Sequence, residues 1–581
     1  MTPEAHITDH LTFLYGPEQA GVALEQLLAI LDDFRLRNPR LQEQVTGERL
    51  TEQDVILITY GDQVTEQGKP PLQTLAEVLE THVKGAITSV HILPFFPYSS
   101  DDGFSITNYT TVNPDFGTWV DVERLDRHFR LMFDAVINHI SAQSRWFQEF
   151  LKGNPEFADY FITVEEEINL SQVVRPRALP LLTRVQTAHG KRLIWTTFSE
   201  DQIDLNYANP DVLLKMIEIL LLYVEKGAEI IRLDAIAYLW KKIGTTCIHL
   251  EETHRVVKLF RAVLDVVAPR VSIVTETNVP HAENVSYFGD GYDEAQMVYQ
   301  FPLPPLVMHA ICSGDASHLS EWAAGLSTPS AGTTFFNFLA SHDGIGVRPV
   351  EGILSPAEVQ SLVERTLAHG GYVSYKTNAD GSQSVYELNI SYFDALSNPD
   401  GPEPLGLQAR RFLVSQAIML SLAGVPGIYV HSLFGSRSWR EGVEQTGRYR
   451  SINREKFRRE ELERELADPS SLRHQVFYPY LHLIRTRAAQ RAFHPNGPQR
   501  VLAVHPALFV LLRTAPDGSE PLLCVHNVSN DEQSFQINLD TFPFPHAGQV
   551  RDLITGITFP VTSSGDLRLK VPPYQVLWLI D

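Results

Sequence analysis

Cysteine is scarce in this sequence, which has only Cys247, Cys312 and Cys524 among its 581 residues. The three lie far apart, so they show none of the short spacings typical of metal sites, and an odd number cannot pair completely. So few cysteines are typical of proteins that work in a reducing compartment. We therefore expect a reduced, cytoplasmic protein.

Basic residues are outnumbered, with 48 Lys and Arg against 70 Asp and Glu and a formal net charge of −22. Nucleic acid and anionic membranes attract basic surfaces, so we expect neither as a partner. Long apolar runs are missing as well. The longest candidate, VLLKMIEILLLYV, contains Lys215 and Glu218 and is too short to span a bilayer. The first residues also lack the basic and apolar stretches of a signal peptide.

What the sequence does contain is typical of a large globular protein. Hydrophobic residues make up 44% of it and charged residues 20%, which excludes disordered and fibrous classes. A chain of this length exceeds one hydrophobic core, so we expect a large catalytic domain with appendages.

Eight short apolar runs alternate with longer amphipathic segments and predict a closed parallel (β/α)8 barrel over residues 51–496, because nearly continuous apolar strands need helices over their outer face. The runs are VILITYG from Val55, SVHILPFFP from Ser89, RLMFDAVIN from Arg130, EIIRLDA from Glu229, VSIVTET from Val271, MVYQF from Met297, TTFFNFLASH from Thr333 and VPGIYVHSL from Val425. In this fold the chemistry lies at the carboxyl ends of the strands.

Other regions predict additions to the barrel. Residues 141–207, after the third strand, and 344–404, after the seventh, are too long for ordinary loops and predict an inserted subdomain and a second inserted lid. Short apolar runs separated by turn residues predict an all-β domain over residues 497–581. Residues 1–50 are helix-like and carry no chemical signal.

Two ions interrupt the fourth apolar run. Residues two apart in a strand share a face, so Arg232 and Asp234 should point together into the barrel. One interpretation is a structural ion pair at the barrel floor. The other is a nucleophilic carboxylate that the guanidinium keeps ionised despite partial burial. This stretch alone does not separate the two.

Further carboxylates end neighbouring strands and favour the catalytic interpretation. Glu276 ends the fifth strand and Asp343 follows His342 at the end of the seventh. Two carboxylates across a glycosidic bond act as nucleophile and general acid, and a third stabilises a positively charged sugar ring. This chemistry needs no metal or organic cofactor, so we expect neither.

Four motifs in order, DAVINH, IRLDA, TET and SHD, make the chain similar to the α-amylase superfamily. Longer segments resemble the sucrose phosphorylase group within it: HILPFFPYSSDDGFS, NHISAQSRWF, IWTTFSEDQIDLNY, FLASHDGIG and YRSINR. The resemblance covers the chain after about residue 50. It implies that Asp234 is the nucleophile, Glu276 the general acid/base and Asp343 the transition-state stabiliser, with Arg232 aligning Asp234.

The resemblance also implies a glucose pocket. His139 and His342 match the family's hydroxyl-binding histidines, and Phe104 matches an apolar wall against the sugar ring. Asp101 and Arg450 match a pair that closes the blind end of the pocket. Amylases often hold calcium near the equivalent of Asn138, but sucrose phosphorylases do not depend on it.

The implied reaction is a double displacement with retention. The partners are a small α-glucoside and inorganic phosphate, and the product is α-glucose 1-phosphate. Four segments look most similar to glucosylglycerate phosphorylases and imply 2-O-α-glucosyl-D-glycerate as the donor: RPRALPLLT, GTTCIHLEETH, TTFFNFLASHDGIG and DEAQMVYQFPLPPLVMHA.

Alternatives remain for both the substrate and the class of protein. They are a sucrose, sucrose 6′-phosphate or glucosylglycerol phosphorylase, a hydrolase or transglucosidase, and a non-catalytic relative. A glycerate carboxylate or a phosphate calls for cationic groups, and the candidates are Arg175, Arg177, Arg348 and Lys376. The oligomeric state has no signal in the sequence.

Overall fold

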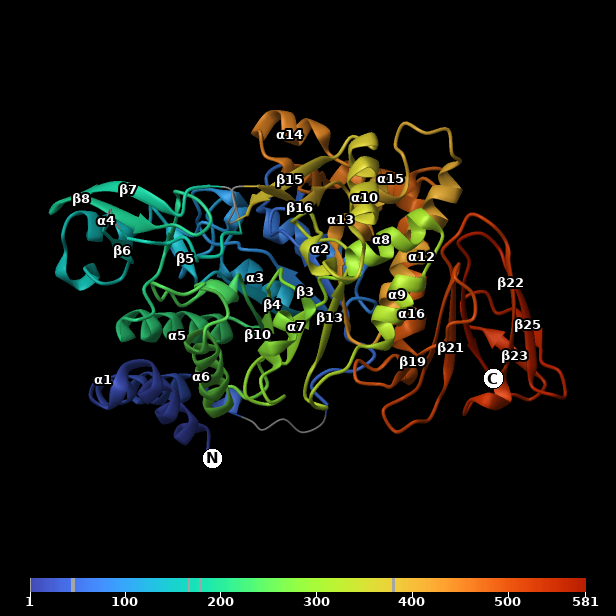
Figure 1. Cartoon of the computed structure of the whole chain (residues 1–581), viewed down its shortest axis with the longest axis horizontal. Coiled ribbons are helices and arrows are strands. Elements are labelled where there is room, and N and C mark those ends of the chain that lie inside the picture. The colour runs from blue at the N-terminus through green and yellow to red at the C-terminus, as the bar shows by residue number, and fades with distance from the viewer. Residues whose placement is uncertain (1, 43–47, 166–167, 177–178, 379–381) are drawn as a thin grey trace.

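A closed barrel of eight parallel strands forms the centre of the computed structural model, which describes the whole chain except residues 1, 43–47, 166–167, 177–178 and 379–381 (Figure 1). Around the barrel the strands follow the order β1-β17-β13-β12-β11-β10-β4-β3. They are β1 (Ile56–Thr59), β3 (Ser89–Ile92), β4 (Arg130–Ala135), β10 (Ala228–Leu233), β11 (Ser272–Thr275), β12 (Met297–Tyr299), β13 (Thr334–Phe338) and β17 (Val425–Tyr429). Seven lie within the predicted runs and β10 begins one residue before its run, so the predicted barrel is confirmed.

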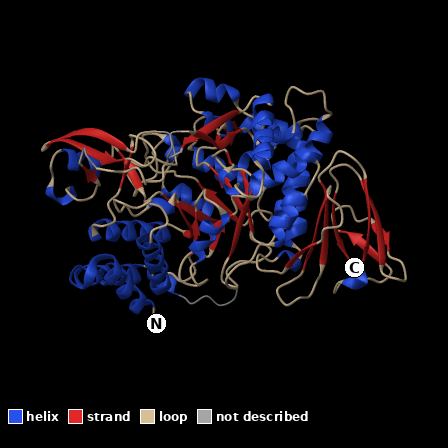
Figure 2. Cartoon of the chain, viewed as in Figure 1, coloured by secondary structure: helices blue, strands red, loops and turns tan. Residues whose placement is uncertain are grey.

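The strands are apolar because both faces of the barrel wall are covered. Every residue of β11, β13 and β17 is buried, and helices surround the sheet (Figure 2). They include α2 (Pro71–His82), α5 (Pro210–Glu225), α6 (Glu251–Val267), α8 (Leu303–Ser313), α12 (Leu405–Ser421) and α16 (Leu472–Ala488). Arg232 on β10 is paired in register with Asp134 on β4, which places ions rather than methyl groups inside the barrel at this level.

Two long segments rise from the carboxyl end of the barrel and border one cavity there. The first follows β4 and forms β5 (His139–Ser141), α4 (Arg145–Leu151), β6 (Thr163–Val164), β7 (Leu182–Thr187), β8 (Gly190–Trp195) and β9 (Gln202–Asp204). The second follows β13 and forms β14 (Ile345–Gly346), α10 (Pro356–Ala368), β15 (Tyr372–Thr377) and β16 (Gln383–Asn389). In Figure 1 the first carries β6, β7 and β8, and the second carries β15 and β16.

The two ends of the chain lie on opposite sides of the barrel (Figure 1). Helix α1 (Pro3–Arg37) lies along α5 and α6, and its Tyr15 Oη donates to the Tyr207 carbonyl at 2.9 Å. The last strands, from β19 (Gln499–Val501) to β26 (Val576–Ile580), form the all-β region. For the whole chain, we propose the predicted domain limits 1–50, 51–496 and 497–581.

A buried arginine connects the all-β region to the barrel domain. Arg513 Nη1 donates to the Ser421 carbonyl at 2.6 Å, at the end of α12, and its Nη2 donates to the His494 carbonyl at 2.7 Å. The first of these bonds satisfies a carbonyl in the last turn of α12, where helix carbonyls have no intrahelical partner. Across the described part of the chain, no helix combines the length and the apolar character needed to cross a membrane.

Candidate active site

A cavity of about 90 Å³ lies at the carboxyl ends of the barrel strands. Its walls include Asp234 after β10, Glu276 after β11 and Asp343 after β13. The three acids come from positions 42 to 109 residues apart, and the barrel brings them to one place. The prediction placed them there because the ends of parallel strands meet at one edge.

Arg232 links the carboxylates beneath this cavity. Its Nη1 lies 2.9 Å from Asp234 Oδ1 and also forms an ion pair with Asp134, and its Nη2 lies 3.9 Å from Glu276 Oε2. The arginine is buried. Glu276 Oε2 also accepts a hydrogen bond of 3.0 Å from the Ala235 backbone N–H. One guanidinium therefore holds the nucleophile and acid candidates on either side of itself.

Burial raises the pKa of both Asp234 and Glu276, and Arg232 opposes the rise in each. Arg232 therefore limits the rise at Asp234 without abolishing it, which sequence reasoning did not anticipate. The guanidinium is closer to Asp234 than to Glu276, so it stabilises the negative charge of Asp234 more. We assign the proton that this coupled pair carries to Glu276.

Asp343 is in the opposite electrostatic situation. Burial acts to raise its pKa, but Arg450 first, then His342 and Arg454, outweigh burial and hold the pKa well below its usual range. Arg450 Nη1 lies 2.5 Å from Asp343 Oδ1. Asp343 is therefore a permanent negative charge at the site, as a transition-state stabiliser requires.

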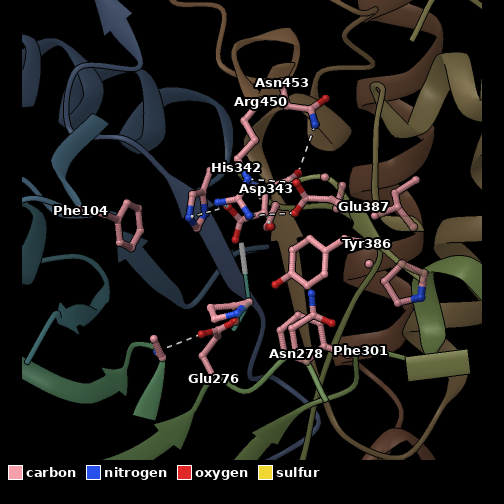
Figure 3. Close-up of a pocket in the computed structure, with 18 of the residues that line it drawn as sticks. Phe104, Glu276, Asn278, Phe301, His342, Asp343, Tyr386, Glu387, Arg450 and Asn453 are labelled. Atoms are coloured by element: carbon pink, nitrogen blue, oxygen red, sulfur yellow. Dashed lines mark hydrogen bonds and ion pairs between the residues drawn. The ribbon is translucent and has the colours of Figure 1, made fainter. Parts of the chain in front are cut away.

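Glu387, on β16, holds Arg450 from the other side. Its two oxygens accept from Arg450 Nε at 3.0 Å and from Nη2 at 2.9 Å, and Glu387 is only 2% exposed. Figure 3 shows Asp343, Arg450 and Glu387 together, with their contacts as dashed lines. The approach requires Gly344, because a Cβ there would lie 2.5 Å from Glu387 Cγ.

The donor wall of the cavity is aromatic. The Phe104 ring stacks on His342 with centroids 4.6 Å apart and an interplanar angle of 5°. Burial lowers the pKa of His342 to about 3, so this imidazole is neutral near pH 7. His139 Nε2 lies 2.9 Å from the Phe104 carbonyl oxygen. The structure thus brings Phe104, His139 and His342 to one side of the cavity.

The two partners predicted for the blind end, Asp101 and Arg450, both line the cavity. Arg450 contacts Asp343 and Glu387, and the charge of Asp101 also acts on it. A second arginine, Arg454, lies close to Asp101 as well, with 3.9 Å between its Nη1 and Asp101 Oδ1. Arg454 is buried and also forms an ion pair with Asp102 at 2.5 Å. Sequence reasoning missed Arg454 although YRSINR contains both arginines.

The three described candidates for anion binding are not among the described residues that line the cavity. Of the three described ones, Arg175 is exposed, Lys376 Nζ lies 3.7 Å from Glu351, and Arg348 is half-buried with its Nε unpaired. Arg177 lies outside the described residues. Among described residues that line the cavity, Arg450 is the only arginine or lysine.

Neutral polar groups complete the second side of the cavity. Asn278, two residues after Glu276, has a buried Oδ1 with no hydrogen-bond partner among the described residues. Tyr386 comes from β16 in the second long segment. Figure 3 shows both side chains across the cavity from Phe104. Sequence reasoning missed both, and the position of Asn278 beside TET was the available signal.

The ammonium group of Lys241 connects the barrel to the first long segment. Lys241 Nζ lies 2.7 Å from Asn138 Oδ1 and 2.5 Å from Asp204 Oδ2, and its side chain is 2% exposed. The positive charge beside the Asn138 and Asp204 oxygens is therefore supplied by the lysine itself. Among the described residues, no cluster of three or more His, Cys, Asp or Glu could hold a metal ion.

Known proteins are similar to this chain in sequence and in architecture. Residues 72–343 match the family model described as alpha amylase, catalytic domain. A glucosylglycerate phosphorylase of Spirochaeta thermophila is 52% identical over 584 residues, covering 100% of this chain and 99% of the relative. One of Escherichia coli K12 is 43% identical over 575 residues and covers 99% of each.

A solved structure also resembles the chain along most of its length. The sucrose 6F-phosphate phosphorylase of Thermoanaerobacter thermosaccharolyticum matches with a TM-score of 0.71 and 25% identity, and covers 91% of this chain and 99% of that one. The match extends beyond the barrel. With the four predicted motifs at the predicted strand ends, these similarities show that the chain belongs to the α-amylase family.

Proposed function

We propose that the protein is a retaining glycoside phosphorylase, a hexosyltransferase that cleaves 2-O-α-glucosyl-D-glycerate with inorganic phosphate. The products are α-D-glucose 1-phosphate and D-glycerate. The observation that carries the proposal is the identity of 43–52% with glucosylglycerate phosphorylases over 99–100% of this chain. The three carboxylates around one cavity support the same chemistry.

In the first displacement, a carboxylate oxygen of Asp234 attacks the anomeric carbon while Glu276 transfers its proton to the glycosidic oxygen. The bond to glycerate breaks, glycerate leaves with a hydroxyl group, and a β-glucosyl-enzyme forms. Arg232 supports this step because it favours the anionic form of Asp234 over that of Glu276. The negative charge of Asp343 stabilises the cationic character of the sugar ring.

In the second displacement, an oxygen of inorganic phosphate attacks the same carbon from the side that glycerate has left. Glu276, now a carboxylate, takes the proton of the attacking hydrogen phosphate, the bond to Asp234 breaks, and both residues return to their starting forms. Two inversions give the α anomer of glucose 1-phosphate. Glycerate and phosphate are both anions that use the same side of the cavity at different times, so one cationic group serves both.

We infer that Arg348 is the best of the predicted candidates for that cationic group. It lies after β14, two residues from cavity-lining Gly346, and its buried Nε has no partner among the described residues. Its charge also acts on Tyr238 in the loop after Asp234. Asn278 and Tyr386 supply neutral hydrogen-bonding groups nearby. Binding a carboxylate requires Arg348 to turn toward the cavity.

The test is the release of glucose 1-phosphate by the purified protein, with and without inorganic phosphate. The donors are glucosylglycerate, sucrose, sucrose 6′-phosphate and glucosylglycerol. We expect phosphate-dependent release that is fastest by far from glucosylglycerate. Faster release from sucrose would overturn the choice of donor, and free glucose without a phosphate requirement would overturn the phosphorylase assignment.

We also infer that the reaction takes place in the cytoplasm. All three cysteines are unpaired, which agrees with a reducing compartment. The partners are small molecules, namely the α-glucoside and phosphate.

A further inference from the structure

A single carboxylate gathers serine hydroxyls beside the donor wall of the cavity. Asp201, just before β9, accepts hydrogen bonds through Oδ2 from Ser99 at 2.5 Å, from Ser105 at 2.8 Å and also from Ser100. Its Oδ1 accepts from Ser141 on β5 at 3.3 Å. The carboxylate thus joins the loop after β3 to the first long segment.

Backbone bonds of the same residue strengthen this junction. The Asp201 carbonyl accepts from Ser105 Oγ at 3.0 Å and from the Ala142 N–H at 2.9 Å. The next residue, Gln202, is buried, and its Nε2 donates to the Phe104 carbonyl at 3.0 Å and lies 3.2 Å from His139 Nε2. Asp201 and Gln202, at the start of β9, therefore both bind the loop after β3.

The loop that they hold has a strained backbone. Asp101 and Asp102 have φ values of 55° and 49°, which L-residues seldom adopt, and Gly103 follows at 108°. A Cβ at Gly103 would lie 2.5 Å from the Pro94 carbonyl oxygen. Consecutive residues in such conformations persist only when their surroundings hold them there.

This strained turn carries groups of the donor pocket. Asp101 and Phe104 line the cavity, and Asp102 forms an ion pair with Arg454. Phe104 in turn stacks on His342. A relaxed turn would move the apolar wall and the blind end together, whereas Asn278 and Tyr386 lie across the cavity from Phe104 (Figure 3).

We propose that Asp201 is a positioning residue for the glucosyl pocket, which it shapes by clamping the strained turn 101–103 through the hydroxyls of Ser99, Ser100 and Ser105. The first long segment therefore shapes the donor side of the site. The proposal deepens the proposed function and rests on it for the identity of the sugar. Asp201 acts through the turn and touches no reacting atom.

The test compares Asp201→Asn with the wild type in the synthetic direction, where the donor is glucose 1-phosphate and the acceptor is D-glycerate. Asparagine has the same shape, but its amide nitrogen cannot accept a hydroxyl hydrogen, so hydroxyls are left unpaired. We expect the KM for glucose 1-phosphate to rise about 10- to 30-fold and the KM for glycerate to change less than about twofold. Glu200→Gln, at the exposed neighbouring residue, is the matched control and should leave both values unchanged.

Two further variants keep the test decisive if Asp201→Asn folds poorly. Ser100→Ala and Ser105→Ala remove one hydroxyl each and should give smaller changes in the same direction. When either serine variant is combined with Asp201→Asn, the KM for glucose 1-phosphate should rise little further, because Asp201→Asn already disrupts the same hydrogen bonds. A lower melting temperature with an unchanged KM for glucose 1-phosphate, or equal changes in both KM values, would overturn the proposal. If the wild type uses another acceptor, that acceptor replaces glycerate and the comparison stands.

Discussion

The donor and acceptor sides of the cavity differ in how firmly the fold holds them. On the donor side, Asp234, Glu276 and Asp343 lie at strand ends, and ion pairs join them to Arg232 or Arg450. On the acceptor side, Asn278 has an unpaired buried oxygen and Arg348 an unpaired Nε among the described residues. The three carboxylates are thus paired with guanidinium groups before substrate arrives, whereas no ion pair among the described residues holds Asn278 or Arg348. A site that accepts glycerate in one step and phosphate in the next requires this asymmetry.

The largest expected effect is on the donor side. Asp234→Asn removes the nucleophile and should lower the release of glucose 1-phosphate by about 10⁴-fold or more. The melting temperature should stay close to that of the wild type because asparagine has the same shape. Asp290→Asn, in an exposed loop, is the control. Substantial turnover by Asp234→Asn would disprove the assignment of the nucleophile.

Removal of Arg450 should have the next largest effect and should change the pH profile. Arg450→Met leaves Asp343 and Glu387 without their shared cation, and we expect kcat/KM to fall on the order of 100-fold. Arg450 holds the pKa of Asp343 down, so its loss raises that pKa. Activity requires ionised Asp343. It is therefore retained at pH values above the pKa of Asp343 and is lost as the pH falls through that pKa.

The acid limb of the kcat/KM profile should therefore move to higher pH in Arg450→Met. Arg448→Gln, at an exposed arginine two residues away, should leave the limb in place. An unchanged acid limb in Arg450→Met would mean that Asp343 does not depend on this ion pair.

A smaller and selective effect is expected on the acceptor side. Arg348→Met should raise the KM for glycerate and the KM for phosphate about tenfold each, and should leave the KM for glucose 1-phosphate nearly unchanged. Lys376→Met is the matched control, because Lys376 Nζ already lies near Glu351. If Lys376→Met rather than Arg348→Met raises the two KM values, the cationic group has been assigned to the wrong residue.

The smallest effect on catalysis is expected far from both sides. Arg513→Met removes a buried guanidinium that binds the carbonyls of Ser421, His494 and Gly497. We expect the free energy of unfolding to fall by about 3 kcal/mol, measured by denaturant titration, with each KM unchanged. A change in the KM for glucose 1-phosphate would show that the all-β region helps to shape the donor side.

The donor side of the site could be predicted from the sequence more completely than the acceptor side. The strands could be predicted because continuous apolar runs record burial on both faces, and the acids could be predicted because strand ends converge. Asp134 as a second partner of Arg232 follows from register between β4 and β10, which no local pattern reveals. The eight predicted strands are confirmed.

The remaining site residues depend on contacts between distant segments. Glu387 reaches Arg450 only because β16 pairs with β14 next to Asp343, and Asp201 reaches three serines about 100 positions earlier. The part that Arg454 plays beside Asp101 also depends on where a short helical turn places two arginines four residues apart. Periodicity and motif spacing carry no information on such approaches.

The most direct test of the account is to trap the glucosyl-enzyme. Glucosylglycerate is mixed with the purified enzyme without phosphate, the reaction is quenched in acid, and the peptides are mapped by mass spectrometry. We predict one added glucosyl unit on the peptide that contains Asp234, lost on a second incubation with phosphate as glucose 1-phosphate appears. A label on another residue, or a label that phosphate does not discharge, would contradict the account.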